Sequence, residues 1–147
     1  MNEAEKLKST LASVFRRKGG GGNYTRLFDD LEPPQKSFLT AKVCLGPDEL
    51  AIIGSAENND TWLILTTERI VWGLRGVEQT LSIHDVWHAK ADFPKMMVTG
   101  TRKHQLRELQ IETRDHENRL IEVEAGGPLF GVWNALLNLG ARNRQKK

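Results

Sequence analysis

Residues 61–76 read TWLILTTERIVWGLRG, two apolar runs of strand length on either side of a short polar segment. The runs are rich in β-branched and aromatic side chains, which favour strands, and each run is too short for a buried helix. The polar residues 66–69 stand where a turn must be. The stretch therefore predicts a β-hairpin.

Further strands are predicted on both sides of this hairpin, because short apolar runs and alternating apolar and polar residues continue along the chain. The other five lie at residues 50–55, 77–83, 86–91, 107–114 and 120–125. Residues 96–98 are expected to resume the strand at 86–91 after a bend. Seven antiparallel strands predict a mainly β fold with some α, in which two bent sheets form a barrel.

A C-terminal helix is predicted at residues 128–139, where apolar side chains recur at helical spacing and Gly140 provides a stop. This helix would cap the open end of the barrel. Phe130 and Leu137 make its apolar stripe wider than a cap needs. We therefore expect them to meet another surface, either the N-terminal helix or a second subunit of a homo-oligomer.

The segment LILTTERIVWGLRG (residues 63–76) resembles the strand, Thr-x-x-Arg turn and strand found early in bacterial pleckstrin-homology-like (PH-like) and GRAM-like domains. The resemblance covers residues 48–141, because the later strands and the closing helix follow the same order. It implies a PH-like barrel that works as a non-catalytic binding or adaptor module. The expected mode is addition of a partner protein's segment at a sheet edge, or in the groove between an edge strand and the C-terminal helix.

Charge is unevenly distributed along the chain. Residues 1–23 carry a net +3 and residues 140–147 a net +4, whereas residues 24–139 hold 12 basic and 17 acidic side chains, a net −5. An acidic body argues against nucleic acid as a partner, since nucleic-acid binding needs clustered Lys and Arg. The alternative function is an immunity or inhibitor protein whose acidic body blocks a basic enzyme.

The N-terminal part divides into an amphipathic basic helix at residues 1–18, a flexible glycine-rich linker at 19–23 and an extension packed on the barrel at 24–47. The helix's apolar stripe could pack on the domain, on a second copy or on lipid. Its basic side chains are candidates for contact with an anionic membrane surface or a partner: Lys6, Lys8, Arg16, Arg17 and Lys18.

The extension is predicted to begin with a short helix, capped by Thr25 and ended by Pro33 and Pro34. Residues 35–45 could be a second helix or a strand. Residues 142–147 are expected to form a solvated basic tail.

A compact basic cluster lies inside the acidic body at Arg102, Lys103 and His104. It is either a solvated loop or a site for an anionic head group or acidic partner. The predicted loop at residues 56–60 is acidic and amidic instead. PH domains that bind phosphoinositides carry basic residues on the strands beside this loop, so inositol phosphates are not expected there.

Nucleophile and metal motifs are missing from the sequence, so we predict neither an enzyme nor a cofactor or metal site. His84 and His88 lie four residues apart, but on a strand that spacing is about 13 Å, too far to share an ion. Cys44 is the single cysteine and is expected to be buried and structural. With no signal segment or membrane span, the expected location is cytoplasmic or peripheral to the inner face of the membrane.

Overall fold

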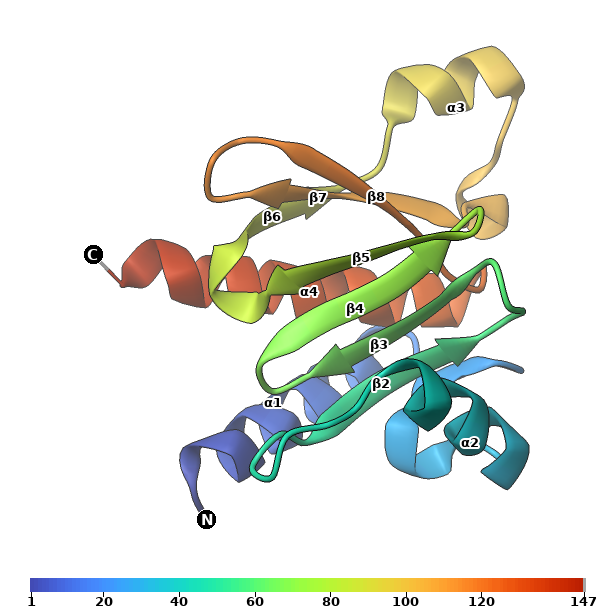
Figure 1. Cartoon of the computed structure of the whole chain (residues 1–147). Helices are drawn as coiled ribbons and strands as arrows, with labels where there is room; N and C mark the ends of the chain where they lie inside the picture. The colour runs from blue at the N-terminus through green and yellow to red at the C-terminus, as the bar shows by residue number, and fades with distance from the viewer. Residues whose placement is uncertain (147) are drawn as a thin grey trace.

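The computed structural model describes residues 1–146, except for the side chains of Phe93 and Lys103, and contains both helices and strands (Figure 1). The strands are β1 (Thr25–Leu27), β2 (Ala51–Ala56), β3 (Trp62–Thr66), β4 (Arg69–Leu74), β5 (Val77–Ser82), β6 (Val86–Lys90), β7 (Glu108–Thr113) and β8 (Asn118–Glu122). The α-helices are α1 (Glu3–Lys18), α2 (Pro33–Lys42), α3 (Phe93–Thr99) and α4 (Gly127–Gln145). Three short 3-10 turns complete the list: η1 (Phe28–Asp30), η2 (Ile83–Asp85) and η3 (Lys103–Gln105).

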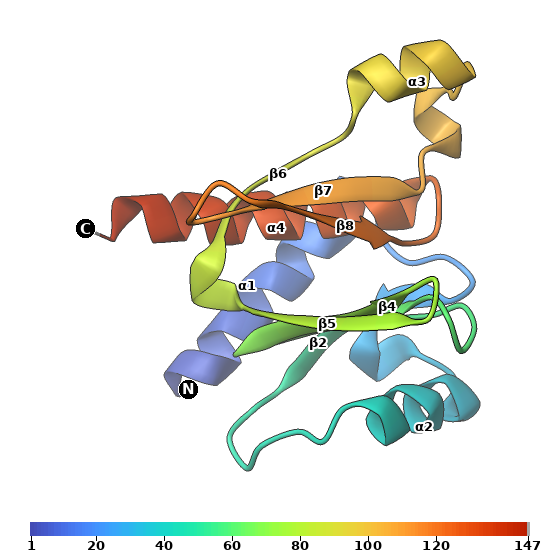
Figure 2. The same cartoon turned by 45° about the horizontal axis from the view of Figure 1, so that its top comes forward.

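The strands form two antiparallel sheets, one of five strands in the order β1-β2-β3-β4-β5 and one of three in the order β6-β7-β8. Figure 2 shows the three-stranded sheet lying over the five-stranded one, with α1 and α4 behind them. α4 packs against both β6 and α1. The structure thus confirms two antiparallel sheets and a C-terminal helix, while no ladder in the described chain joins the sheets into one.

The hairpin predicted at residues 61–76 is confirmed as β3 and β4, with Ile64 opposite Val71 and Leu65 opposite Ile70. Trp72 is only 1% exposed and lies in the main core. That core is filled by apolar side chains from both sheets, α1 and α4, among them Phe15, Leu63, Ile70, Leu109, Ile111, Ile121, Leu129 and Val132.

A second, smaller core lies on the outer face of the five-stranded sheet, where the extension packs. Ile64 and Val71 meet Leu31 and Leu39 there. Gly54 of β2 makes this contact possible, because a Cβ at that position would lie 2.6 Å from Leu39 and 2.7 Å from Leu31. The extension therefore covers a sheet face that would otherwise expose apolar side chains.

Within the extension the predicted short helix was wrong. Thr25 lies in β1 and pairs with Ser55 of β2, so the five-stranded sheet gains an edge strand that the sequence pattern did not reveal. Pro33 and Pro34 begin α2 rather than ending a helix, since proline is well tolerated in the first turn. Residues 35–45 were expected to form either a second helix or a strand. Most of this segment is helical, because α2 ends at Lys42.

The strand expected at residues 96–98 was also wrong, because these residues lie in α3. Asp92 caps this helix by accepting a hydrogen bond from the Lys95 N–H at 3.0 Å. The left-handed backbone of Gly100 (φ 72°) ends the helix. Asp92 and Gly100 are typical helix signals, and they outweigh the β-branched and apolar run between them.

Gly140 does not end the last helix, which continues to Gln145. The predicted solvated tail is therefore partly helical, and Asn143 within it is 4% exposed. Lys147 lies outside the described residues.

The glycine-rich segment at residues 19–23 packs against the start of α4 and against Glu124. A Cβ at Gly19 would clash with the backbone carbonyl of Gly127 at the start of α4, and one at Gly22 would lie 2.5 Å from the Glu124 carboxylate. Glycine thus lets the end of α1 cross the start of α4. Cys44, expected to be buried, is exposed in the loop after α2.

Candidate functional site

The edge of β6 that faces α4 is covered by side chains of that helix. The Trp133 indole donates to the Ala89 carbonyl at 3.0 Å. The buried Asn143 amide donates to the carbonyls of Ile83 and Val86 at 2.8 and 2.7 Å. Carbonyls that a partner strand would need as acceptors are therefore already bonded within the chain.

α4 also approaches β6 too closely for a peptide to enter between them. A Cβ at Gly140 would clash with the Trp87 carbonyl, and the Arg144 guanidinium donates to that same carbonyl. The strand–helix groove expected from the family resemblance is consequently filled by α4 itself.

The edges of β1 and β8 are partly covered as well. In β1, the Thr25 N–H donates to Glu124 at 3.0 Å, and the Thr25 carbonyl accepts from the Gly22 N–H at 2.9 Å. In β8, the Leu120 carbonyl accepts from the Trp72 indole at 3.0 Å. Each of these edges thus carries at least one bond that an added strand would have to replace.

β5 differs from the other edge strands. It pairs only with β4, and the register puts Leu74 opposite Val77 and Trp72 opposite Gln79. Since pairing alternates along an antiparallel ladder, the N–H and C=O groups of Glu78 and Thr80 point away from β4. The described residues provide no hydrogen-bond partner for these four backbone groups.

The β5 edge lacks two features that protect many edge strands, although it carries one exposed charge at Glu78. Its pairing with β4 contains no register shift, and the strand contains no proline. Arg75 and Gly76, at φ 52° and 80°, form a tight two-residue turn that leaves β5 fully extended beside β4. Val77 is 59% exposed at the start of the strand. β5 therefore offers an accessible edge for strand addition.

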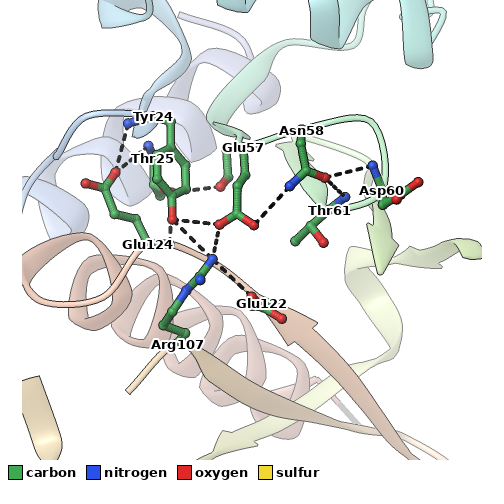
Figure 3. A network of polar contacts seen from close by, with 10 residues as sticks. Tyr24, Thr25, Glu57, Asn58, Asp60, Thr61, Arg107, Glu122 and Glu124 are labelled. Atoms are coloured by element: carbon green, nitrogen blue, oxygen red, sulfur yellow. Dashed lines mark hydrogen bonds and ion pairs between the residues drawn. The ribbon is translucent and has the colours of Figure 1, made fainter. Parts of the chain in front are cut away.

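A network of polar side chains joins the two sheets at the β2–β3 loop (Figure 3). We call Tyr24, Glu57, Arg107 and Glu122 the clasp. The Tyr24 hydroxyl donates to Glu57 at 2.7 Å, and Arg107 pairs with Glu57 and lies 3.0 Å from Glu122. Burial raises the pKa of Tyr24, Arg107 opposes that rise, and the Glu124 and Glu122 carboxylates add to it.

Glu124 anchors the segment that follows the glycines. Its carboxylate accepts hydrogen bonds from the N–H groups of Asn23, Tyr24 and Thr25, at 2.8, 2.8 and 3.0 Å. The clasp and Glu124 together hold the β2–β3 loop and the start of β1 against the end of β8. Arg107 is thus bound to carboxylates of the chain rather than presented to a phosphate.

A second polar cluster explains the Thr-x-x-Arg turn on which the family resemblance rests. Arg69 holds the buried Glu49 carboxylate through two nitrogens, at 2.9 and 3.2 Å. The Thr66 hydroxyl donates to Glu49 at 2.5 Å and accepts from the Glu68 and Arg69 N–H groups at 3.1 and 3.0 Å. These residues fix the hairpin turn, and they are bonded to one another rather than presented to a ligand.

The basic cluster predicted in the body lies next to α3. Arg102 and His104 are exposed and flank Lys103, whose side chain lies outside the described residues. α3 projects away from the rest of the chain (Figures 1 and 2). Its Met97 and Val98 are 85% and 87% exposed. This exposed apolar pair was not predicted from the sequence, because residues 96–98 were expected to form a strand.

The N-terminal helix was expected to pack on the domain, on a second copy or on lipid, and in the structure it packs on the domain. Leu11 and Phe15 are buried in the main core, and Phe15 touches Gly131 of α4. Lys8 pairs with Asp29 at 2.9 Å. The other basic candidates of this helix are exposed: Lys6, Arg16, Arg17 and Lys18.

Phe130 and Leu137 are partly buried, and both pack against the main core. Phe130 also stacks on Trp133, with ring centroids 6.1 Å apart. Their apolar surface is thus largely used within the chain.

His84 lies in η2 and His88 in β6. The described residues hold no cluster of three His, Cys, Asp or Glu side chains arranged to bind a metal ion. Among the described helices, none has the length and apolar character needed to cross a membrane.

Comparisons with protein-family models, with curated proteins and with solved structures found no match to this chain.

Proposed function

We propose that this chain is a non-catalytic binding module of PH-like type, which recognises a partner protein by adding one of its strands to β5. The observation that carries the proposal is the β5 edge, whose outward backbone groups at Glu78 and Thr80 have no partner among the described residues. Apart from α3 and η3 between β6 and β7, the order of β2–β8 and α4 agrees with the order that the resemblance implies, and this supports the PH-like part of the proposal.

Strand addition would draw its free energy from main-chain hydrogen bonds, each contributing about 0.5–1.5 kcal/mol net. Up to four such bonds can form at Glu78 and Thr80, so the edge alone supports modest affinity. Specificity would come from side chains beside the edge. Val77 offers exposed apolar surface, while Glu78 and Arg75 offer charges of opposite sign.

A proline variant separates this proposal from other binding modes. Thr80→Pro removes an outward N–H, which an edge strand tolerates because that group makes no bond to β4. Thr80→Val keeps the N–H and serves as the matched control. We expect Thr80→Pro to lose a partner captured by the wild-type chain, while Thr80→Val retains it and both variants keep the wild-type circular dichroism spectrum.

A direct measurement covers the case in which Thr80→Pro fails to fold. In the wild-type complex, hydrogen exchange at the Glu78 and Thr80 amides should slow by at least tenfold relative to the free chain. Unchanged exchange at both amides would overturn the proposal. A captured basic enzyme that Thr80→Pro still binds, and that high salt releases, would instead favour the inhibitor function predicted from the acidic body.

A further inference from the structure

Residues 93–106, which hold α3 and η3, form a finger that leaves the three-stranded sheet between β6 and β7 (Figures 1 and 2). A groove of about 370 Å³ separates it from the outer face of β7 and β8, with Met96 on one side and Leu120 on the other. The finger therefore stands off the body and presents a convex surface.

The finger exposes two adjacent apolar side chains. Met97 and Val98 are neighbours, and with exposures of 85% and 87% they are more exposed than any other large apolar side chain in the described chain. Val77, the next most exposed away from the terminus, reaches 59%. An apolar pair held out in this way marks an interaction surface.

Several polar groups at this end of the finger are bonded within it. The Met96 carbonyl accepts from the N–H groups of Gly100 and Thr101. The Thr99 hydroxyl donates to the Lys95 carbonyl at 2.9 Å and lies 2.7 Å from the Thr101 hydroxyl. These groups keep their bonds without water, which lowers the cost of taking this part of the finger out of water.

Charge on the finger has one sign. Residues 93–106 include Lys95, Arg102 and Lys103 but no Asp or Glu. Glu108, just outside the finger, pairs with Lys95 at 2.8 Å. Arg102 makes no ion pair with a described residue, so an anionic surface suits this side of the finger.

We infer that the finger binds the surface of an anionic lipid bilayer, with Met97 and Val98 entering the boundary between head groups and acyl chains. Arg102 and His104 then lie at the level of the head groups. Exposed apolar side chains beside basic ones suit the surface of an anionic bilayer, where the apolar part meets the acyl chains and the basic groups meet the lipid head groups. The β4–β5 turn lies close to the finger, because Glu108 pairs with Arg75 of that turn at 3.6 Å and with Lys95 of the finger at 2.8 Å.

Vesicle sedimentation tests the inference with the full-length chain. Vesicles of phosphatidylcholine containing phosphatidylglycerol should sediment the protein, and vesicles of phosphatidylcholine alone should sediment much less. The double variant Met97→Asp with Val98→Asp should weaken binding at least tenfold. Met97→Leu with Val98→Ile should retain it, because the apolar surface is kept.

Two control variants place the contact on the finger. Ser37→Asp with Ala41→Asp adds the same charge to the exposed side of α2, which lies on the opposite side of the molecule (Figure 1), and should leave binding unchanged. Arg16→Glu with Arg17→Glu tests the basic end of α1. Loss of vesicle binding only in the Arg16→Glu, Arg17→Glu variant would overturn the inference. So would the absence of vesicle binding by the wild-type chain. Wild-type vesicle binding by the Met97→Asp, Val98→Asp variant would also overturn it.

A fluorescent probe at Met97 gives a second readout, because it reports the surroundings of the finger itself. The exposed Cys44 is first changed to Ser, and an environment-sensitive dye is attached to a Met97→Cys variant. A blue shift on adding anionic vesicles is expected. An unchanged emission maximum in a sample that sediments with the vesicles would contradict insertion of the finger.

Discussion

Glu49 is the buried carboxylate on which the β3–β4 turn depends. Its side chain is 3% exposed and accepts hydrogen bonds from Arg69, from Thr66 and from the Gly46 N–H. The Thr-x-x-Arg pattern is therefore explained by structure: the threonine fixes the turn and the arginine neutralises the carboxylate. That pattern supports a statement about fold and none about a ligand.

Glu49→Gln should destabilise the fold by about 2 kcal/mol at pH 7, because hydrogen bonds to a charged group contribute about 1.5–3 kcal/mol. Urea denaturation measures the change. Glu117→Gln is the matched control, since that side chain is 65% exposed and its ion pair with Arg119 should contribute little. If Glu49→Gln and Glu117→Gln changed the free energy of unfolding equally, Glu49 would not be the carboxylate that stabilises the turn.

The same carboxylate makes stability depend on pH. Burial alone would raise the pKa of Glu49, but hydrogen bonds from Arg69, Thr66 and the Gly46 N–H outweigh it and hold the pKa below its ordinary value of 4.5. A pKa that is lower in the folded state contributes stability above pH 4.5, and this contribution is lost as pH falls through the folded value.

The free-energy difference between the wild type and Glu49→Gln should therefore shrink as the pH is lowered from neutral toward about 3. Urea denaturation at a series of pH values measures it. A difference that stays constant over this range would show that Glu49 is not stabilised as a carboxylate.

At the scale of elements, α4 covers the edge of β6 as well as packing against the core. Asn143 lies beyond Gly140, the predicted end of the helix, yet its amide donates to the carbonyls of Ile83 in η2 and Val86 at the start of β6. Glycine is a common stop signal, and here it serves instead as the point where helix and strand backbones meet. The sequence alone does not distinguish these two uses.

Asn143→Ala should cost about 1–3 kcal/mol, because it leaves the Ile83 and Val86 carbonyls without a partner in a buried site. Thermal unfolding followed by circular dichroism measures the loss. Asn138→Ala is the control, since that side chain bonds only the exposed Arg142. If Asn143→Ala and Asn138→Ala unfolded at the same temperature, the hydrogen bonds from Asn143 to Ile83 and Val86 would not stabilise the packing of α4 on β6.

The elements that periodicity reveals best were predicted correctly: the β3–β4 hairpin, the alternating β5 and β7 strands and the two long helices. β1 was missed because three residues are too few to show a period. α3 was missed because Met96 and Val98 suit a strand as well as a helix, and its capping residues Asp92 and Gly100 were not weighed.

At the scale of the whole molecule, the clasp connects three separate parts of the chain. Tyr24 precedes β1, Glu57 lies in the β2–β3 loop, and Arg107 and Glu122 border β7 and β8. Neither these pairings nor the coverage of each sheet edge can be read from sequence, since they depend on contacts between distant residues. The sequence therefore predicted that a partner would bind at a sheet edge, but it did not identify β5 as the strand at that edge.

A double-mutant cycle with Glu57→Gln and Arg107→Gln should give a coupling energy of about 0.5–1 kcal/mol, as both side chains are partly exposed. The buried Nε of Arg107 has no hydrogen-bond partner among the described residues, which lowers the net benefit of the pair. Urea denaturation of the four proteins measures the coupling. Additive single effects would show that the clasp does not join the sheets energetically.

The central claim is that β5 presents an open sheet edge. Amide hydrogen exchange of the free chain, resolved by residue with NMR, tests it most directly. The Gln79 and Leu81 amides should exchange at least about 100-fold more slowly than those of Glu78 and Thr80, because only the first pair is bonded to β4. Equal protection of all four amides would contradict the claim.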